Sequence, residues 1–143
     1  MFCSVSGVAN EERPSDRLVA QRIRNRVIEY LEMAASYEDQ REYERNVPIA
    51  HIPSEVINQW EDNFPRGLHH YASDREAYTP DEFAALESFA DVWRSTADAV
   101  PDDWPTLAEA QAMPEWSQLR QGAVKALAVF MRRGKLPEDD EVI

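Results

Sequence analysis

The sequence predicts an all-α fold, a compact single-domain bundle of four long helices with one or two short ones. Apolar residues recur at helical spacing in four separate stretches. Glycine occurs four times, and the nine prolines stand at the starts and breaks of these stretches. With 143 residues, the chain is long enough to bury roughly 70% of its unfolded surface without disulfides or metal. One helical domain over residues 15–136 is therefore expected.

The first helix is expected to begin after Ser15, since serine is a favoured N-cap residue. The apolar pattern fades after Tyr37, so the polar residues up to about Asn46 either extend this helix or form a separate, solvent-exposed turn. Two prolines, Pro48 and Pro53, predict an extended connector over residues 47–53. The face expected to meet the core comprises Val19, Ile23, Val27, Tyr30, Leu31, Ala34 and Tyr37.

The second helix is expected to start at Pro53, which suits the first turn of a helix. It should end at Pro65 and Gly67, followed by a polar loop over residues 68–78. Its apolar residues at helical spacing are Val56, Ile57, Trp60 and Phe64.

Two capping boxes predict the third and fourth helices. In Thr79-Pro80-Asp81-Glu82, threonine is followed three residues later by a glutamate that can bond back to the cap amide. This helix should end near Pro101, and its core face should contain Phe83, Leu86, Phe89, Ala90, Trp93 and Ala97. The second box, Thr106 to Glu109, predicts a short helix that Pro114 stops.

The last helix should begin at Pro114 and end at Gly134, a favoured residue after a helix C-terminus. Flanking this domain, residues 1–14 are expected to be flexible and the acidic residues 137–143 frayed. The inward residues of the last helix are expected to be Trp116, Leu119, Ala123, Ala126, Leu127 and Phe130.

The charge balance limits the kinds of partner. There are 27 acidic and 15 basic residues, a net charge of -12, which argues against binding to nucleic acid or to an anionic membrane. The single cysteine, Cys3, fits a reducing compartment. Neither a secretory signal nor an apolar run of membrane-spanning length is recognisable. The expectation is a cytoplasmic protein.

Most of the negative charge lies in the middle of the chain. Residues 47–105 contain twelve acidic and three basic residues, and thus most of the net charge. On the helix after Thr79, Glu87, Asp91 and Asp98 fall within about 40° of one another, away from the apolar face. Asp102 and Asp103 extend this acidic set past the helix end.

This acidic surface leads to the hypothesis of a non-enzymatic interaction protein that binds a basic protein, with no cofactor. Trp104 is expected to be an aromatic anchor beside Glu87, Asp91, Asp98, Asp102 and Asp103. An inhibitor of the immunity-protein or antitoxin type is the most concrete version, by analogy of size and acidity alone. A solvated face that keeps the protein soluble would account for the same charges.

Other interpretations remain open at this stage. A metal-dependent enzyme could use His69, His70, Asp74 and Glu76, although their spacing matches no established ligand motif. A self-associating subunit, such as a homodimer, could bury Tyr37 and Tyr43. No serine-nucleophile elbow or phosphate-binding loop is present.

Two further sets of residues have a structural interpretation. The arginines of the first helix resemble a nucleic-acid stripe, but Arg22 and Arg26 share a face with Glu29, so a salt-bridge face is preferred; Arg17 and Arg24 point elsewhere. His51, between two prolines, is expected to be a hydrogen-bonded structural residue.

Overall fold

The computed structural model describes residues 13–63 and 75–143, and within these ranges the chain is helical without strands, as predicted. Most of the N-terminal segment expected to be flexible lies outside the described residues, as do His69, His70 and Asp74. The helices are α2 (Asp16–Ala35), α3 (Tyr37–Asn46), α4 (Ile52–Asn63), α7 (Pro80–Ala99), α8 (Leu107–Gln111) and α9 (Pro114–Phe130).

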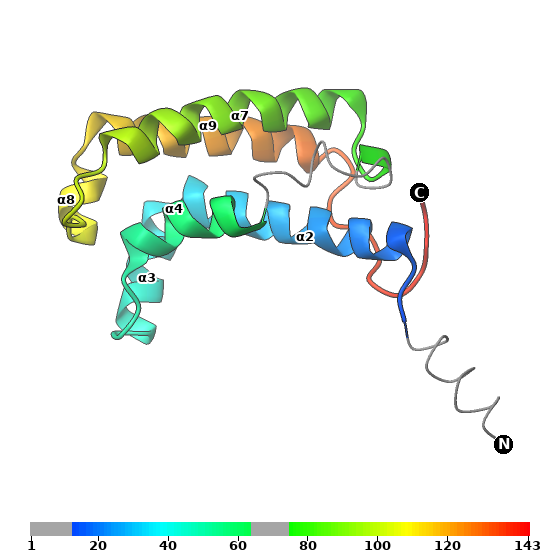
Figure 1. The fold of residues 1–143 in the computed structure, drawn as a ribbon, viewed down its shortest axis with the longest axis horizontal. Helices are drawn as coiled ribbons and strands as arrows, with labels where there is room; N and C mark the ends of the chain where they lie inside the picture. Colours follow the sequence, from blue (N-terminus) through cyan, green and yellow to red (C-terminus); the bar gives the residue numbers. More distant parts are fainter. Residues whose placement is uncertain (1–12, 64–74) are drawn as a thin grey trace, which may run out of the picture.

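The helices form two layers. Helices α7 and α9 run antiparallel, side by side, and α2 and α4 lie beneath them (Figure 1). The short helix α8 closes one end of the upper layer, while α3 projects from the lower layer at the same end (Figure 1). Because α9 packs on both α7 and α2, it is the central helix of the bundle.

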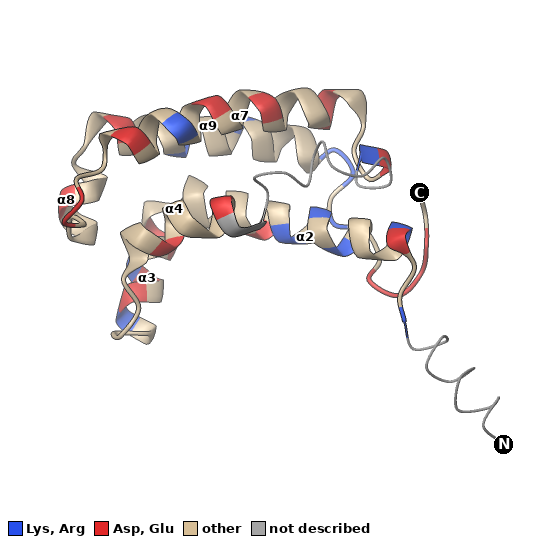
Figure 2. Ribbon diagram, in the orientation of Figure 1, with Lys and Arg blue, Asp and Glu red and all other residues tan. Residues whose placement is uncertain are grey.

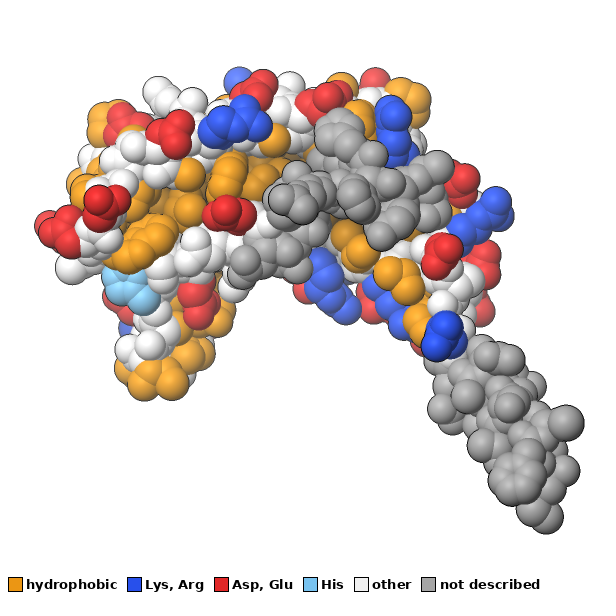
Figure 3. All heavy atoms as spheres, viewed as in Figure 1, with side chains coloured by type: hydrophobic (Ala, Val, Ile, Leu, Met, Phe, Trp, Pro, Cys, Tyr) orange, Lys and Arg blue, Asp and Glu red, His pale blue; other side chains and the backbone are white. Residues whose placement is uncertain are grey.

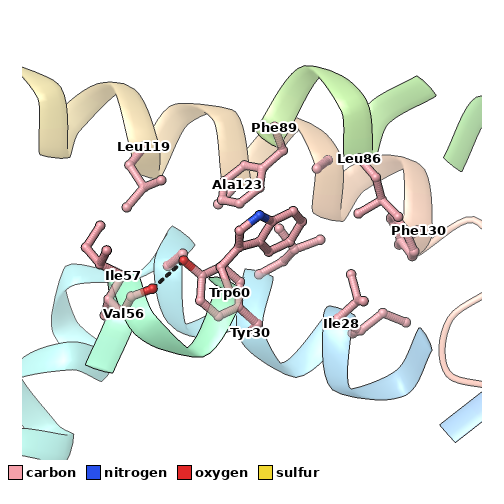
Figure 4. Packing of buried hydrophobic residues seen from close by; sticks show 14 of the residues in the cluster. Ile28, Tyr30, Val56, Ile57, Trp60, Leu86, Phe89, Leu119, Ala123 and Phe130 are labelled. Carbon is pink, nitrogen blue, oxygen red and sulfur yellow. Dashed lines mark hydrogen bonds between the residues drawn. The ribbon is translucent and has the colours of Figure 1, made fainter. Parts of the chain in front are cut away.

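The core between the layers is aromatic (Figure 4). The ring centroid of Trp60 lies 5.4 Å from that of Tyr30 and 4.9 Å from that of Phe89, so α4 is packed between α2 and α7. The Tyr30 hydroxyl donates to the Val56 carbonyl at 2.6 Å. Burial raises the pKa of Tyr30, which keeps this donor protonated.

The cap residues act as the sequence predicts. Ser15, Thr79 and Thr106 each accept a hydrogen bond from a first-turn amide, and both threonines belong to complete capping boxes. Gly134 has a φ of +74°, the left-handed conformation that glycine adopts without strain. Ser36 separates α2 from α3 by accepting from the Asp39 amide, so the polar stretch is a helix of its own.

One side of α2 differs from the expectation. Val19, expected to face the core, is 37% exposed, whereas Gln21, Arg24 and Asn25 are almost completely buried. Gln21 and Asn25 are buried because residues 135–143, which include the segment predicted to be frayed, fold back and hydrogen-bond to α2. Arg24 is buried against Glu82 of α7 and Phe130 at the end of α9. The apolar periodicity of α2 contains no sign of a polar segment packing there.

Candidate functional site

The acidic residues singled out by the sequence lie on one exposed surface. Glu87, Asp91 and Asp98 are exposed on α7, on the side opposite its buried residues Leu86 and Phe89. Figure 2 shows acidic residues at intervals along α7, and Figure 3 shows acidic side chains exposed over this helix. The segment after the helix extends the set toward α8. We call this surface the acidic face: Glu87, Asp91, Asp98, Asp102 and Asp103.

Among the residues that the structure describes, most of this charge has no ion-pair partner. Asp91 pairs with Arg94 at 3.1 Å, but both side chains are mostly exposed, so the pair contributes little to stability. Within residues 13–63 and 75–143, the other four members of the acidic face form no ion pair. The remaining carboxylates therefore present a concentrated negative charge to solvent.

Trp104 lies next to the acidic face, in the connector that follows α7, and is 38% exposed. Its ring centroid is 6.2 Å from that of His51, in an edge-on arrangement. The His51 imidazole accepts a hydrogen bond from the Ser54 amide at 3.4 Å, at the start of α4. His51 therefore supports both the helix start and the indole ring, which fits the structural role expected for it.

A groove that the helical periodicity does not predict runs between α7 and α9 and has a volume of about 480 Å³. A Cβ at Gly122 would lie 3.5 Å from the side chains of Phe89 and Val92, an ordinary van der Waals distance, so this position of α9 faces α7. Small residues that face one another across two helices are the signal that could have revealed it. The groove is lined by Ala85, Ser88, Phe89, Val92, Gln118, Gln121, Gly122, Lys125, Ala126 and Val129.

A buried ion-pair network lies at the opposite end of α7. The Arg24 guanidinium donates to the Glu82 carboxylate at 2.8 Å, and both side chains are almost completely inaccessible. Arg133 binds the same carboxylate from the protein surface at 2.5 Å. Helical spacing predicts that Arg24 points away from the salt-bridge face of α2 but does not indicate that it is buried. On the predicted salt-bridge face of α2, Arg26 and Glu29 form an ion pair at 2.8 Å.

Several opposing influences set the pKa of Glu82. Burial alone would raise it, but hydrogen bonds from Arg133, Arg24 and the Thr79 amide outweigh burial and lower the pKa of this carboxyl. Glu82 is therefore ionised and fully engaged by its partners. Its role is therefore structural: it holds the helices of the bundle together.

The proposed metal ligands are only partly visible. Glu76 forms an ion pair with Arg17 at 3.3 Å. Across the part of the chain that the structure describes, no three His, Cys, Asp or Glu side chains are grouped as a metal site. The helices in that part include none that combines the length and apolarity needed to cross a membrane.

Known proteins provide no additional guide to the function of these surfaces. No family model matches the chain, and neither the curated proteins nor the solved structures gave a significant match. The acidic face, the groove between α7 and α9 and the covered side of α2 must therefore be interpreted from their own chemistry.

Proposed function

We propose that this protein is a non-enzymatic interaction protein whose acidic face binds a basic surface of another protein. The observation that supports this proposal best is the row of exposed carboxylates on one side of α7, most of them without an ion-pair partner among the described residues. Trp104, half-exposed at the end of this row, supplies an aromatic contact of the kind enriched at interfaces.

The scaffold beneath the acidic face suits recognition of a partner. Helix α7 is fixed by packing against α9 along its length and by the capping box of Thr79 at its start. Carboxylates on a pre-ordered helix lose little backbone entropy on binding, so more of their interaction energy contributes to affinity. Complementary charge also accelerates encounter and disfavours acidic competitors.

The most concrete version of this proposal is an inhibitor of the immunity-protein or antitoxin type. Such a protein would cover the basic active site of a toxin by steric and electrostatic occlusion. The size and acidity of the chain support this version by analogy alone.

A charge-reversal experiment tests the proposal. The partner is captured from a lysate on the immobilised protein, identified by mass spectrometry and purified, and association rates are then measured at low and high salt. We expect E87K/D91K/D98K to slow association at least tenfold and to flatten its salt dependence, because the face steers the encounter.

The matched control is E38K/E42K/E44K, which changes the net charge equally on exposed positions of α3. This variant should retain the association rate within about twofold, apart from the small effect of net charge. The proposal fails if no basic protein is captured, or if both triple variants associate equally fast. In the latter case the acidic face is a solvated surface.

A further inference from the structure

Residues 135–143 form an irregular segment, with bends at residues 138–140, that lies along one side of α2; we call it the acidic strap (Figure 1). The Gln21 side chain holds it at three main-chain positions. Its amide nitrogen donates to the carbonyls of Pro137 at 2.9 Å and Asp140 at 2.8 Å. Its amide oxygen accepts from the Val142 amide at 2.7 Å. Both the nitrogen and the oxygen of this buried amide therefore hydrogen-bond to the backbone of the strap.

Asn25, one helical turn further along α2, binds the strap in the same way. Its nitrogen donates to the Leu136 carbonyl and its oxygen accepts from the Leu136 amide, both at 2.8 Å. It also donates to the Glu138 carboxylate. Because residues four apart lie on the same face of a helix, Gln21 and Asn25 form a continuous pair of buried amides.

Basic residues flank this pair and contact the acidic part of the strap. Arg26 binds the Glu138 carboxylate at 3.1 Å. Arg22 lies 3.7 Å from the Asp139 carboxylate and donates to the Glu138 carbonyl at 2.8 Å. At the far end, Arg17 donates to the Ile143 carbonyl at 3.4 Å. This side of α2 thus binds a bent main chain together with negative charge.

The strap is held mainly by polar contacts. Pro137 and Asp139–Glu141 are exposed, and Val142 is 56% exposed, whereas Leu136 is half-buried and Ile143 packs against the core. Segments with few buried apolar contacts open at a lower free energy than the core. Most of the hydrogen bonds also go to main-chain atoms, which another peptide that bends in the same way and has similar charge can supply.

We propose that this side of α2 is a binding surface for an acidic peptide segment of another protein that bends as the acidic strap does, and that the acidic strap occupies it in cis. The proposal is independent of the acidic face, because it concerns a different helix and the opposite charge. Tethering gives the strap a high effective concentration, so a peptide in trans should bind measurably when the strap is loosened.

Loosening the strap tests this proposal on the full chain. The variant E138K/D139K places two lysines against Arg22 and Arg26, whereas D140K/E141K makes the same change of charge at side chains without a contact to α2. The probe is a fluorescein-labelled peptide with the sequence KLPEDDEVI, titrated by fluorescence anisotropy. We expect it to bind E138K/D139K at least tenfold more tightly than D140K/E141K or the unmodified chain.

Recognition by α2 itself is tested on the loosened chain. Adding Q21A/N25A should abolish peptide binding, because it removes both side-chain amides that hydrogen-bond to the peptide backbone. Adding R22E instead should also abolish binding, and it does not alter a fully buried residue. Circular dichroism shows whether each variant is folded. If Q21A/N25A has lost its fold, the R22E variant tests whether α2 binds the peptide. Retained affinity in folded variants of both kinds would overturn the proposal.

Hydrogen exchange shows whether the strap is displaced. The amides of Leu136 and Val142 should exchange faster in E138K/D139K than in D140K/E141K, while core amides are unchanged. The proposal is overturned if these amides exchange freely and the peptide still does not bind, or if they exchange only with global unfolding. Light scattering that reveals dimers with exchanged straps would assign the surface to a second copy of the chain, which also overturns it.

Discussion

The two capping boxes of this chain share a sequence pattern but differ in their surroundings. In both, a threonine accepts from the amide of a glutamate three residues later, and the glutamate accepts from the threonine amide. Glu109 does this at the surface. Glu82 is buried and binds Arg24 and Arg133 as well as the Thr79 amide. The same four-residue pattern therefore caps a short helix in one place and anchors the bundle in the other.

The difference shows what a local motif specifies. The hydrogen bonds within each box depend on four consecutive residues, which explains why both are predictable. Whether the glutamate is also buried depends on Arg24, 58 residues earlier, and on Arg133, 51 residues later. Glu82 joins α7 to α2 and to the segment after α9, whereas Glu109 has no such partner among the described residues.

The largest expected effect comes from removing the buried carboxylate. We expect E82A to lower the free energy of unfolding by about 3–5 kcal/mol, because it leaves the buried guanidinium of Arg24 without its counter-ion. Urea denaturation followed by circular dichroism measures the loss. E109A is the matched control and should cost much less. Equal losses in the two variants would show that the buried pair adds nothing to the cap.

The dependence of the unfolding free energy on pH in the acid range should also differ between the two capping boxes. The pKa of Glu82 is lower in the folded protein than its ordinary value. Its contribution is therefore complete above the pKa of the unfolded state and is lost as the pH falls through the folded pKa. Between pH 7 and pH 2, we expect the difference in unfolding free energy between E82Q and the unmodified chain to shrink.

Glu109 also has a lowered pKa, caused first by its hydrogen bond to the Thr106 amide and then by that to the Thr106 hydroxyl. The sign of its pH dependence is the same as for Glu82, so E109Q is the appropriate comparison. The free energy of unfolding is measured at intervals of half a pH unit. As the pH falls, the value for E82Q should approach that of the unmodified chain more strongly than the value for E109Q does. A constant offset for E82Q across this range would contradict the role assigned to its charge.

The smallest expected effect concerns the threonines. T79A and T106A each remove the hydroxyl that accepts from the first turn, which typically costs about 1 kcal/mol. T79A should be the more damaging, because it also loosens the positioning of Glu82, while T106A affects the five residues of α8. Thermal unfolding of both variants tests this order, and a larger effect of T106A would reverse our comparison.

Much of the fold could be predicted because its signals are local. Ser15, Pro114 and Gly134 mark helix ends through their own backbone and side-chain chemistry. The exposed carboxylates of α7 follow in the same way from their angular separation from the apolar residues. Helix periodicity thus identifies both a core face and the surface opposite to it.

Contacts between distant segments could not be predicted in this way. Gln21 and Asn25 are polar residues that the periodicity of α2 places outside the core, yet a segment more than 100 residues later covers them. The groove beside Gly122 likewise depends on how closely α7 approaches α9. Both features require the packing order of the helices, which no local pattern contains.

The antiparallel arrangement of α7 and α9 determines which charge belongs where in the buried pair. Glu82 lies in the first turn of α7, where the helix macrodipole is positive. Arg24 donates to the carbonyls of Phe130 and Gly134 at the end of α9, where the macrodipole is negative. Exchanging the two residues would keep the net charge but place each one against the unfavourable end of a helix. The directions of the two helices therefore determine that the acidic residue lies at the start of α7 and the basic residue beside the end of α9.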